Sequence, residues 1–493
     1  MSRIYKYLSI LNFEYYLYII FGCIYLIVAL NSFGFDDEFY NLNIVENLGI
    51  GVTSFTQRDD VHPPLSFYFN SQLIRFLNDW SLVRAVSALF LMMSIIYYTR
   101  NVGKGKSEKI LLFLLIATSP SLLLWGTSLR WYAYFLPTLF IMLVKPKSQN
   151  FTYWLKFIIG SLLLGHIGYI FLLLSPILFL YYLNGYKRPT KLIILHSTVS
   201  ILLIILFYTP QLVVFYNYHL PNGSNQYDSF LKNLQGVFIS IFSNQGLFPI
   251  TIFGILGAIG VMIMIYSSII NIKKLKNLYH NSFSHFVLGV FLFLISGIAS
   301  KFRNLVIIEP FKSKWIIDQK KYEKTKKLFI IGFLLIITSN IVGMYNVVNH
   351  ENTTKNSWNL PISETLKIFN ESIDAENTII VTHDPSLTYI LRNEGYSVIS
   401  TYFREGNTPV NEAKFINVVY LKTFKGSMDI TYYDSIIRLI ESLEYKTYEV
   451  ISLRRDSHHA IKKRLDPYYP EYVIQMMVYK GVENIRILNS LDL

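Results

Sequence analysis

The chain has 493 residues, of which 52% are hydrophobic and only 16% are charged, whereas soluble domains carry about 25% charged residues. Its 45 Lys and Arg outnumber its 32 Asp and Glu, for a net charge of +13, and its one cysteine, Cys23, excludes an intramolecular disulfide and a cysteine metal site. This composition excludes an ordinary soluble protein and favours an integral membrane protein.

Apolar stretches recur along the chain at about the 20-residue length that crosses a hydrocarbon core. The first lacks a small-residue cleavage site, so it is expected to be a retained helix rather than a signal peptide. The stretch at 303–317 is short, and Glu309, Lys312 and Lys314 interrupt it. We predict about eleven transmembrane helices, at 15–33, 82–99, 108–125, 127–144, 153–168, 169–184, 191–215, 246–270, 283–300, 303–317 and 327–348.

The basic residues gather in short loops between the apolar stretches, at 100–109, 145–147, 187–191, 273–276 and 320–327. This is the positive-inside pattern, so the charge indicates a membrane protein and no nucleic-acid partner. It predicts a cytoplasmic N-terminus, with three regions outside: 34–80, 217–245 and everything after about 350. The many Ile, Asn, Lys and Tyr residues are typical of an AT-rich bacterial source, which favours a multi-pass protein of the bacterial plasma (inner) membrane.

The chain changes character after about residue 350. Strand patterns at 377–383, 415–421, 446–453 and 472–479 alternate with helical patterns at 363–372, 385–392 and 432–442. This alternation favours a small α/β domain. The predicted fold is therefore an all-α polytopic membrane bundle at 1–350, followed by an extracytoplasmic α/β domain at 351–493.

The first outer loop, 34–80, is long enough to suggest a function. Asp36, Asp37 and Glu38 follow the first predicted helix directly. A carboxylate shielded at the membrane boundary can have a raised pKa and act as a general base. Further on, Pro63 predicts the start of a helix, because proline is favoured in a first helical turn. His62 would lie just before that helix, where its imidazole can donate to a phosphate or a sugar hydroxyl. The alternative is that the acidic residues only mark where the chain leaves the bilayer, with Asp36 as a helix cap.

Arg130 stands close to the start of the predicted span at 127–144. A basic side chain in an apolar span is costly and usually faces a polar cavity or a partner. The alternative is that the Arg130 side chain extends to the membrane surface and places its charge in water. This alternative is stronger for Lys301 and Arg303, because both lie at the edge of a span.

Four short motifs occur in order at the predicted outer face. Asp37-Glu38 opens the first loop, His62-Pro63-Pro64-Leu65 follows in the same loop, Ser128-Leu129-Arg130-Trp131-Tyr132-Ala133 begins the fourth span, and Lys301-Phe302-Arg303 begins the tenth. Together they resemble the GT-C class of membrane glycosyltransferases. This class includes protein O-mannosyltransferases, lipid A aminoarabinose transferases and their bacterial relatives.

The resemblance implies an inverting glycosyltransferase. Its donor would be a polyprenyl-phosphate-linked sugar, and its acceptor a cell-envelope glycan, glycolipid or protein on the outer face. Asp37 matches the catalytic Asp of the class, which deprotonates the acceptor hydroxyl. Glu38 would support Asp37 or bind the sugar, although a solvated loop carboxylate is an alternative.

The resemblance also implies a set of donor-binding residues. The leaving group is a lipid phosphate, whose developing charge requires preorganised donors. His62 and Arg130, with Lys301 or Arg303, are the candidates, because an arginine fork matches phosphate oxygens. Tyr132 is a candidate to stack on the sugar, or else belongs to the aromatic belt at the membrane interface.

No Asp-x-Asp motif occurs in a context suited to a nucleotide sugar, which favours a lipid-linked donor. We expect no metal and no other cofactor, and membrane lipid as a partner. Two alternatives remain. A transporter or flippase for a lipid-linked glycan would show paired repeats with interrupted helices, and a polysaccharide polymerase would have its large outer loop late in the chain.

Overall fold

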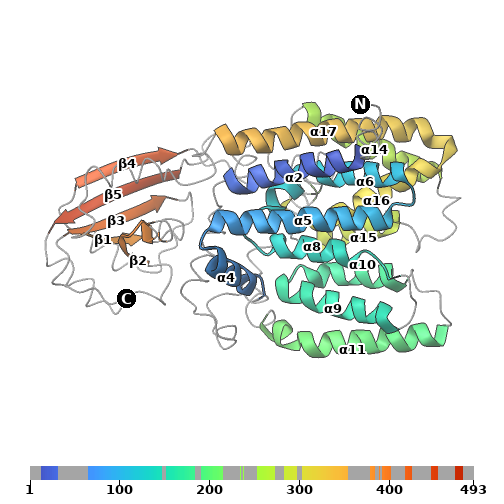
Figure 1. The fold of residues 1–493 in the computed structure, drawn as a ribbon, viewed down its shortest axis with the longest axis horizontal. Helices are drawn as coiled ribbons and strands as arrows, with labels where there is room; N and C mark the ends of the chain where they lie inside the picture. Colours follow the sequence, from blue (N-terminus) through green and yellow to red (C-terminus); the bar gives the residue numbers. More distant parts are fainter. Residues whose placement is uncertain are drawn as a thin grey trace, which may run out of the picture. The chain divides into compact units, whose positions relative to one another are not determined.

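The computed structural model contains two compact units, one helical and one built on a β-sheet (Figure 1). The helical unit is described over residues 13–31, 65–146, 151–183, 190–214, 252–271, 282–296 and 302–349, with positions 234 and 237. The sheet unit is described over 350–353, 378–382, 388, 391–392, 394–400, 417–424, 446–452 and 472–480. The helices, strands and contacts that follow belong to these described residues.

Five helices in the described part of the chain are long and apolar enough to cross a membrane. They are α2 (Phe13–Asn31), α5 (Trp80–Val102), α11 (Thr190–Val214), α14 (Ile252–Ile270) and α17 (Lys326–Thr353). A sixth span is formed if α6 (Lys106–Ala117) and α7 (Pro120–Gly126), which meet at 62°, are counted as one. Pro120 explains the bend, because proline begins a helix readily but cannot continue one.

Four further helices are apolar but shorter, with 11 to 17 residues: α8 (Tyr132–Met142), α9 (Phe151–Ile167), α10 (Phe171–Leu183) and α15 (Ser282–Ile295). The predicted division between the spans at 153–168 and 169–184 is confirmed, since α9 ends at Ile167 and α10 begins at Phe171. The structure thus confirms a bundle of apolar helices. Eleven complete spans stay a prediction, because a helix needs about 20 residues to cross the hydrocarbon core.

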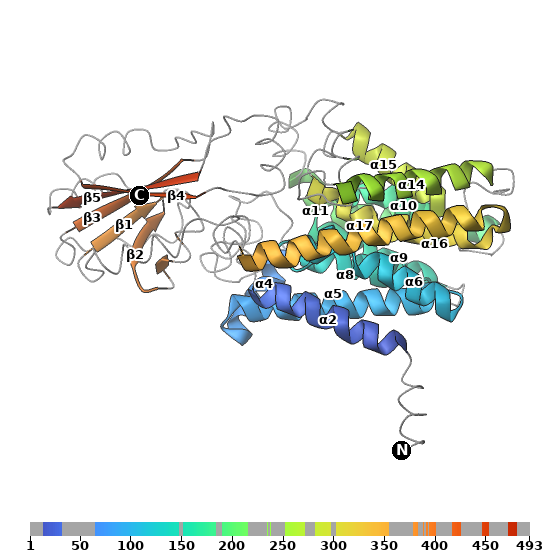
Figure 2. The same ribbon diagram turned by 90° about the horizontal axis from the view of Figure 1, so that it is seen from above.

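The long helix α5 packs against both α2 and α8, as the two ribbon views show (Figures 1 and 2). Asp79 caps its first turn and accepts from the Ser81 backbone N–H at 2.7 Å and the Ser81 hydroxyl at 2.6 Å. The Ser81 hydroxyl, followed by the backbone N–H groups, holds the pKa of the Asp79 carboxyl below its usual value. The cap therefore sets where α5 begins, one turn before Arg84.

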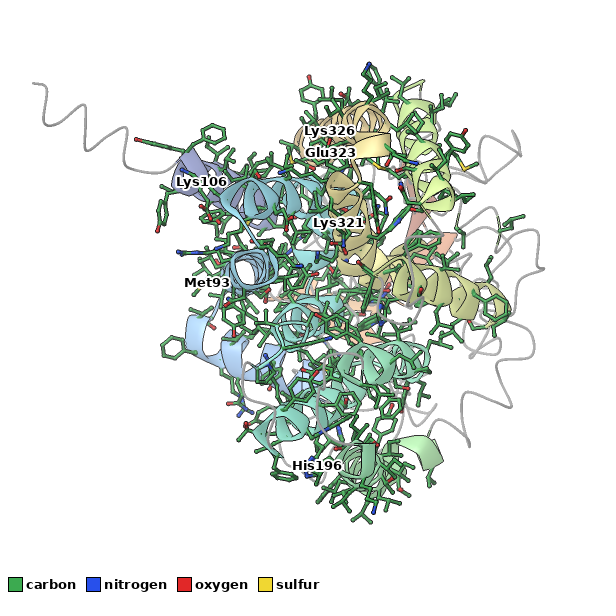
Figure 3. The ribbon with its side chains drawn as sticks, turned by 90° about the vertical axis from the view of Figure 1, so that its right-hand side faces the viewer. Met93, Lys106, His196, Lys321, Glu323 and Lys326 are labelled. Carbon is green, nitrogen blue, oxygen red and sulfur yellow. The ribbon has the colours of Figure 1, made fainter. Side chains whose placement is uncertain are left out.

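Two predicted basic loops lie at the same end of the bundle. Lys320 Nζ donates to Ser107 Oγ at 2.5 Å, which joins the loop at 100–109 to the loop at 320–327. Figure 3, a view along the bundle, shows Lys106, Lys321 and Lys326 from this end. Both loops therefore face the same side of the bundle, as the positive-inside rule requires of cytoplasmic loops.

The predicted span at 303–317 is not one helix. The segment forms a 3₁₀ helix, η6 (Phe302–Ile308), followed by α16 (Glu309–Asp318) and the short turns η7 (Gln319–Lys321) and η8 (Glu323–Thr325). Lys312 Nζ lies 2.7 Å from Glu309 Oε2, and the Ser313 hydroxyl donates to Glu309 Oε1 at 3.0 Å. The charges that interrupt the apolar pattern are thus paired inside the bundle. A short, broken element accommodates them because buried charges require partners.

Neutralising one member of this buried pair is expected to destabilise the protein strongly. Lys312→Met leaves the Glu309 carboxylate buried without its cation, at an expected cost of about 3–5 kcal/mol. The double variant Glu309→Gln/Lys312→Met is expected to recover most of that loss, because no unpaired charge remains. The free energy of unfolding, measured in detergent micelles, checks both expectations.

The exposed pair of Lys326 and Glu323 provides the matched control. Their charged atoms lie 3.8 Å apart at the bundle end shown in Figure 3. Because exposed ion pairs contribute about 0–1 kcal/mol, Lys326→Met is expected to leave stability nearly unchanged. Equal losses from Lys312→Met and Lys326→Met would show that burial of the Glu309 pair has no such effect.

Three side chains donate hydrogen bonds to carbonyls at the C-terminal end of α8, the helix that begins beside Arg130. The Tyr182 hydroxyl donates to Met142 O at 2.7 Å, the Tyr181 hydroxyl donates to Leu143 O at 2.6 Å, and Lys156 Nζ donates to Val144 O. The last carbonyls of a helix lack partners within it. The donors from α9 and α10 satisfy them and hold α8 in place.

The sheet unit contains five strands in the order β2-β1-β3-β5-β4, with β1 parallel to β2 and β3, and β5 antiparallel to β3 and β4. The four predicted strands are confirmed as β1, β3, β4 and β5, whereas β2 was not predicted. Most of the predicted helices lie outside the described residues, so the α/β assignment stays a prediction. The strands are β1 (Thr378–Thr382), β2 (Ser397–Ser400), β3 (Asn417–Phe424), β4 (Lys446–Ser452) and β5 (Tyr472–Lys480).

Candidate functional site

The predicted site residues differ in how much of them the structure describes. Asp37, Glu38, His62 and Lys301 lie outside the described residues. The backbone of Arg303 belongs to η6, without a described side chain. Arg130 and Tyr132 are fully described, and the geometry of the candidate site is therefore built around them.

Arg130 lies in the non-helical segment that joins α7 to α8, residues 127–131, which we name the Arg130 turn. Two side-chain hydroxyls at the C-terminal end of α7 donate hydrogen bonds to carbonyls of that helix. Thr127 Oγ1 donates to Leu123 O at 2.8 Å, and Ser128 Oγ donates to Trp125 O at 2.8 Å. Such local bonds compete with the helix pattern and favour its termination. Arg130 is buried in this turn, with 6% of its surface exposed.

Donors from two other helices bind the backbone of the Arg130 turn. Arg84 Nε on α5 donates to Thr127 O at 3.1 Å. Asn70 Nδ2 donates to Leu129 O at 3.1 Å, and the Tyr134 hydroxyl donates to Asn70 Oδ1 at 2.5 Å. Hydrogen bonds to the carbonyls of residues 127 and 129 thus fix the backbone of the turn.

Asn70 also relates the turn to the His62 motif. It lies on α4 (Leu65–Leu77), a helix that begins at the last residue of His62-Pro63-Pro64-Leu65. Phe69 of the same helix packs against the Tyr134 ring, with centroids 5.2 Å apart. The helix after the His62 motif therefore packs directly on the turn and on α8.

Tyr132, the first residue of α8, directly follows the turn and connects it to η6. Its hydroxyl donates to Asn304 Oδ1 at 2.9 Å, and Asn304 is the neighbour of Arg303 in the chain. The structure therefore brings together the motifs around Arg130 and Arg303, which are far apart in the sequence. The Tyr132 ring is buried beside Trp131 and Trp125, with centroids 3.7 and 5.9 Å away. Stacking of this ring on a sugar stays a prediction, and one that this packing does not favour.

Three residues of this arrangement are absent from the sequence-based predictions: Asn70, Arg84 and Asn304. Arg84 could have been predicted from the sequence, because it is a basic residue inside a predicted apolar span. The same argument led to Arg130. Asn70 and Asn304 carry no comparable signal, because their side chains are uncharged. Their role depends on partners that only the fold supplies.

Removing the hydroxyl of Tyr132 is expected to loosen the link between the turn and η6. Tyr132→Phe keeps the ring packed and loses one hydrogen bond, so the free energy of unfolding is expected to fall by about 1 kcal/mol. Chemical unfolding in detergent micelles measures it. Tyr97→Phe, at an exposed position of α5, is the control and should keep the wild-type stability; equal stabilities for both variants would contradict a role for the link.

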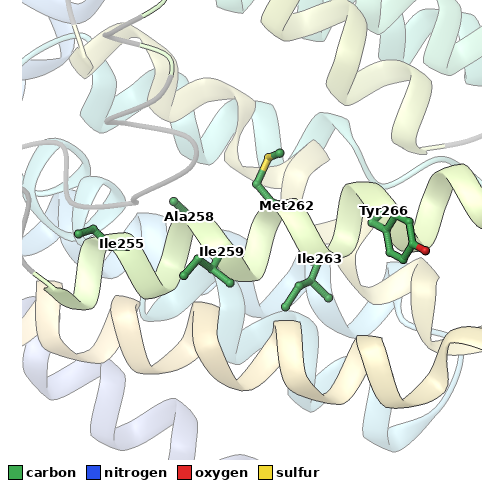
Figure 4. A pocket seen from close by; sticks show the side chains of 6 residues that line it. All are labelled: Ile255, Ala258, Ile259, Met262, Ile263 and Tyr266. Atoms are coloured by element: carbon green, nitrogen blue, oxygen red, sulfur yellow. The ribbon is translucent and has the colours of Figure 1, made fainter.

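An apolar depression of about 540 Å³ lies elsewhere, along α14 (Figure 4). It is lined by Ile255, Ala258, Ile259, Met262, Ile263 and Tyr266. This lining offers no charged group to a phosphate, and an apolar groove on a membrane helix suits hydrocarbon chains. The depression therefore does not replace the Arg130 turn as the candidate site for a phosphate.

No protein-family model matches the chain, and no curated protein sequence is significantly similar to it. Solved structures are similar. ArnT from Cupriavidus metallidurans in the apo state aligns over 94% of this chain and 97% of its own, with a TM-score of 0.54 and 9% identity. The same protein bound to undecaprenyl phosphate aligns over 94% and 98%, with a TM-score of 0.53 and 11% identity. ArnT is an aminoarabinose transferase. The chain therefore has the fold of ArnT, a glycosyltransferase of the GT-C class.

Proposed function

We propose that this protein is a membrane glycosyltransferase that moves a sugar from a polyprenyl-phosphate carrier to a cell-envelope glycan, glycolipid or protein on the outer face of the plasma membrane. One observation carries the proposal: the hydrogen bond from Tyr132 to Asn304, which joins the Arg130 turn to the 3₁₀ helix of Arg303. It occurs in a fold shared with ArnT, which has been solved with undecaprenyl phosphate bound.

The chemistry of the turn suits a lipid phosphate. When the bond between the anomeric carbon and the phosphate oxygen breaks, the electron pair stays with the carrier phosphate. Arg130 is the residue proposed to stabilise that charge, because its planar guanidinium pairs with two phosphate oxygens at once. A buried position strengthens the interaction, since little water competes for it. His62, with Lys301 or Arg303, completes the proposed phosphate site.

The acceptor side of the reaction is assigned to the acidic pair after α2. Asp37 takes the proton of the acceptor hydroxyl as its oxygen bonds to the anomeric carbon, on the face opposite the leaving phosphate. Attack from that face inverts the configuration of the sugar. Glu38 supports Asp37 or binds a sugar hydroxyl. No metal or other cofactor is required in this scheme.

A transfer assay tests the proposal. The purified protein in lipid nanodiscs is mixed with a radiolabelled undecaprenyl-phosphate sugar and a membrane extract that supplies acceptors. Label is expected in an extractable glycan, lipid or protein, and none is expected when a labelled nucleotide sugar replaces the lipid donor. If no acceptor is labelled from any lipid-linked sugar offered, the enzyme proposal fails.

The same assay separates the two alternative functions. A flippase would move the intact lipid-linked sugar between leaflets of a proteoliposome without transferring it. A polymerase would extend one lipid-linked glycan with another, so label would remain on the carrier. Transfer to an acceptor that is not a second lipid-linked glycan excludes both.

A further inference from the structure

The buried arginine of α5 is a charged group that the proposed reaction does not use. Arg84 lies near the start of the apolar helix Trp80–Val102, with 1% of its surface exposed. A cation in an apolar span is costly, and such residues are retained where they contact specific partners. Its Nε donates to Thr127 O at 3.1 Å, and its Cζ lies 5.9 Å from the centre of the Trp80 ring.

The acceptor of this hydrogen bond is the carbonyl at the end of α7. Thr127 is the C-terminal cap of that helix, where carbonyls have no partner within the helix. A charged donor forms a stronger bond to such a carbonyl than a neutral donor does. The bond is made three residues before Arg130, at the first residue of the Arg130 turn.

Arg84 differs in this respect from the other anchors of the turn. Asn70 is a neutral donor to Leu129 O, and Tyr132 acts through its side chain on Asn304. Arg84 alone among these three joins the turn to one of the long apolar helices. Its Nε is bound to the Thr127 carbonyl, so its proposed effect on the reaction passes through the backbone of the turn.

We propose that Arg84 is a positioning residue: by holding the carbonyl of Thr127, it sets the place of Arg130 relative to the carrier phosphate. This inference rests on the proposed function. A displacement of about 1 Å at a reacting group can cost about 100-fold in rate. Loss of the guanidinium fork at position 84 should therefore weaken donor binding and transfer together.

The test compares Arg84→Lys with Arg100→Lys in nanodiscs. Both arginines lie on α5 and face an aromatic ring at a similar distance, since Arg100 Cζ lies 5.8 Å from the centre of the Tyr15 ring. Arg100 is exposed at the opposite end of the helix and serves as the control. Three quantities are measured: the melting temperature, the affinity for undecaprenyl phosphate, and kcat and KM for donor and acceptor.

Arg84→Lys is expected to lower kcat/KM for the lipid donor about 10- to 100-fold, to weaken undecaprenyl phosphate binding, and to leave the acceptor KM unchanged. The melting temperature should stay near that of wild type, because the buried charge is kept. Arg100→Lys should match wild type throughout. Wild-type donor binding and kcat/KM in a folded Arg84→Lys protein would overturn the proposal, as would equal losses in both variants.

A second variant covers the case in which Arg84→Lys does not fold. Arg84→Gln keeps an N–H donor without a buried charge and is measured in the same way; failure of both variants to fold would make Arg84 structural and would overturn its positioning role. The lipid-binding readout also separates the two proposals. If wild type binds undecaprenyl phosphate but transfers no sugar, the proposed function fails while the binding comparison still decides the role of Arg84.

Discussion

Replacing Asp37 by Asn is expected to abolish most sugar transfer while leaving the protein folded. An amide cannot accept the proton of the acceptor hydroxyl, and the loss of a general base costs about 10²–10⁴-fold in rate. The fall should appear in kcat, because neither the carrier phosphate nor its arginine is altered. Label transfer from the lipid-linked donor, measured at saturating donor, gives the rate, and the melting temperature shows whether the fold is intact.

The neighbouring Asp36 provides a matched control for this experiment. It has the same charge in the same acidic cluster, but the motif assigns the proton transfer to Asp37 alone. Asp36→Asn is therefore expected to retain most of the wild-type rate. Equal transfer by wild type and Asp37→Asn would remove Asp37 from the mechanism. Equal loss in both variants would mean that the cluster acts through its total charge.

Replacing Arg130 by Lys is expected to produce the second large loss. Lysine keeps the positive charge but lacks the planar fork that pairs with two phosphate oxygens. Removing one preorganised donor from a site where charge develops costs about 10²–10³-fold. The loss should appear in kcat/KM for the donor, and the affinity for undecaprenyl phosphate should fall with it.

Arg75 supplies the control for Arg130. It lies in the last turn of α4, the helix that packs on the Arg130 turn, and its side chain is exposed. Arg75→Lys is expected to leave kcat/KM and lipid binding at wild-type values. An Arg130→Lys protein that binds undecaprenyl phosphate as tightly as wild type would place the carrier phosphate elsewhere.

The helical unit shows how far the hydrophobic pattern alone can be followed. Long apolar runs predict α5 and α17 well, because a run of such length has few other stable structures in a bilayer. The segment at 303–317 was predicted as a short span interrupted by charges, and the structure divides it between η6 and α16. Glu309 and Lys312 pair with each other inside the bundle, and the pairing depends on the helices that surround them. A pattern along the chain does not contain that information.

The candidate site shows the same division. The Arg130 motif and the predicted outer loops were evident from residue types and their order. The contact between Tyr132 and Asn304 spans 172 positions, and the contact between Arg84 and Thr127 spans 43. Neither follows from local spacing. Each exists because packed helices bring a donor to a particular acceptor.

The sequence by itself determined that this protein belongs in a membrane and where most of its apolar segments lie, and it predicts which motifs face the outer side. These properties follow from hydropathy and charge, which act on each segment separately. The tertiary structure decided that the Arg130 turn meets η6, that Asn70 and Arg84 hold its backbone, and that the charges of α16 are buried as a pair. The physical reason is that hydrogen bonds and ion pairs act over about 3–4 Å, so they depend on the packing of distant segments rather than on any one of them.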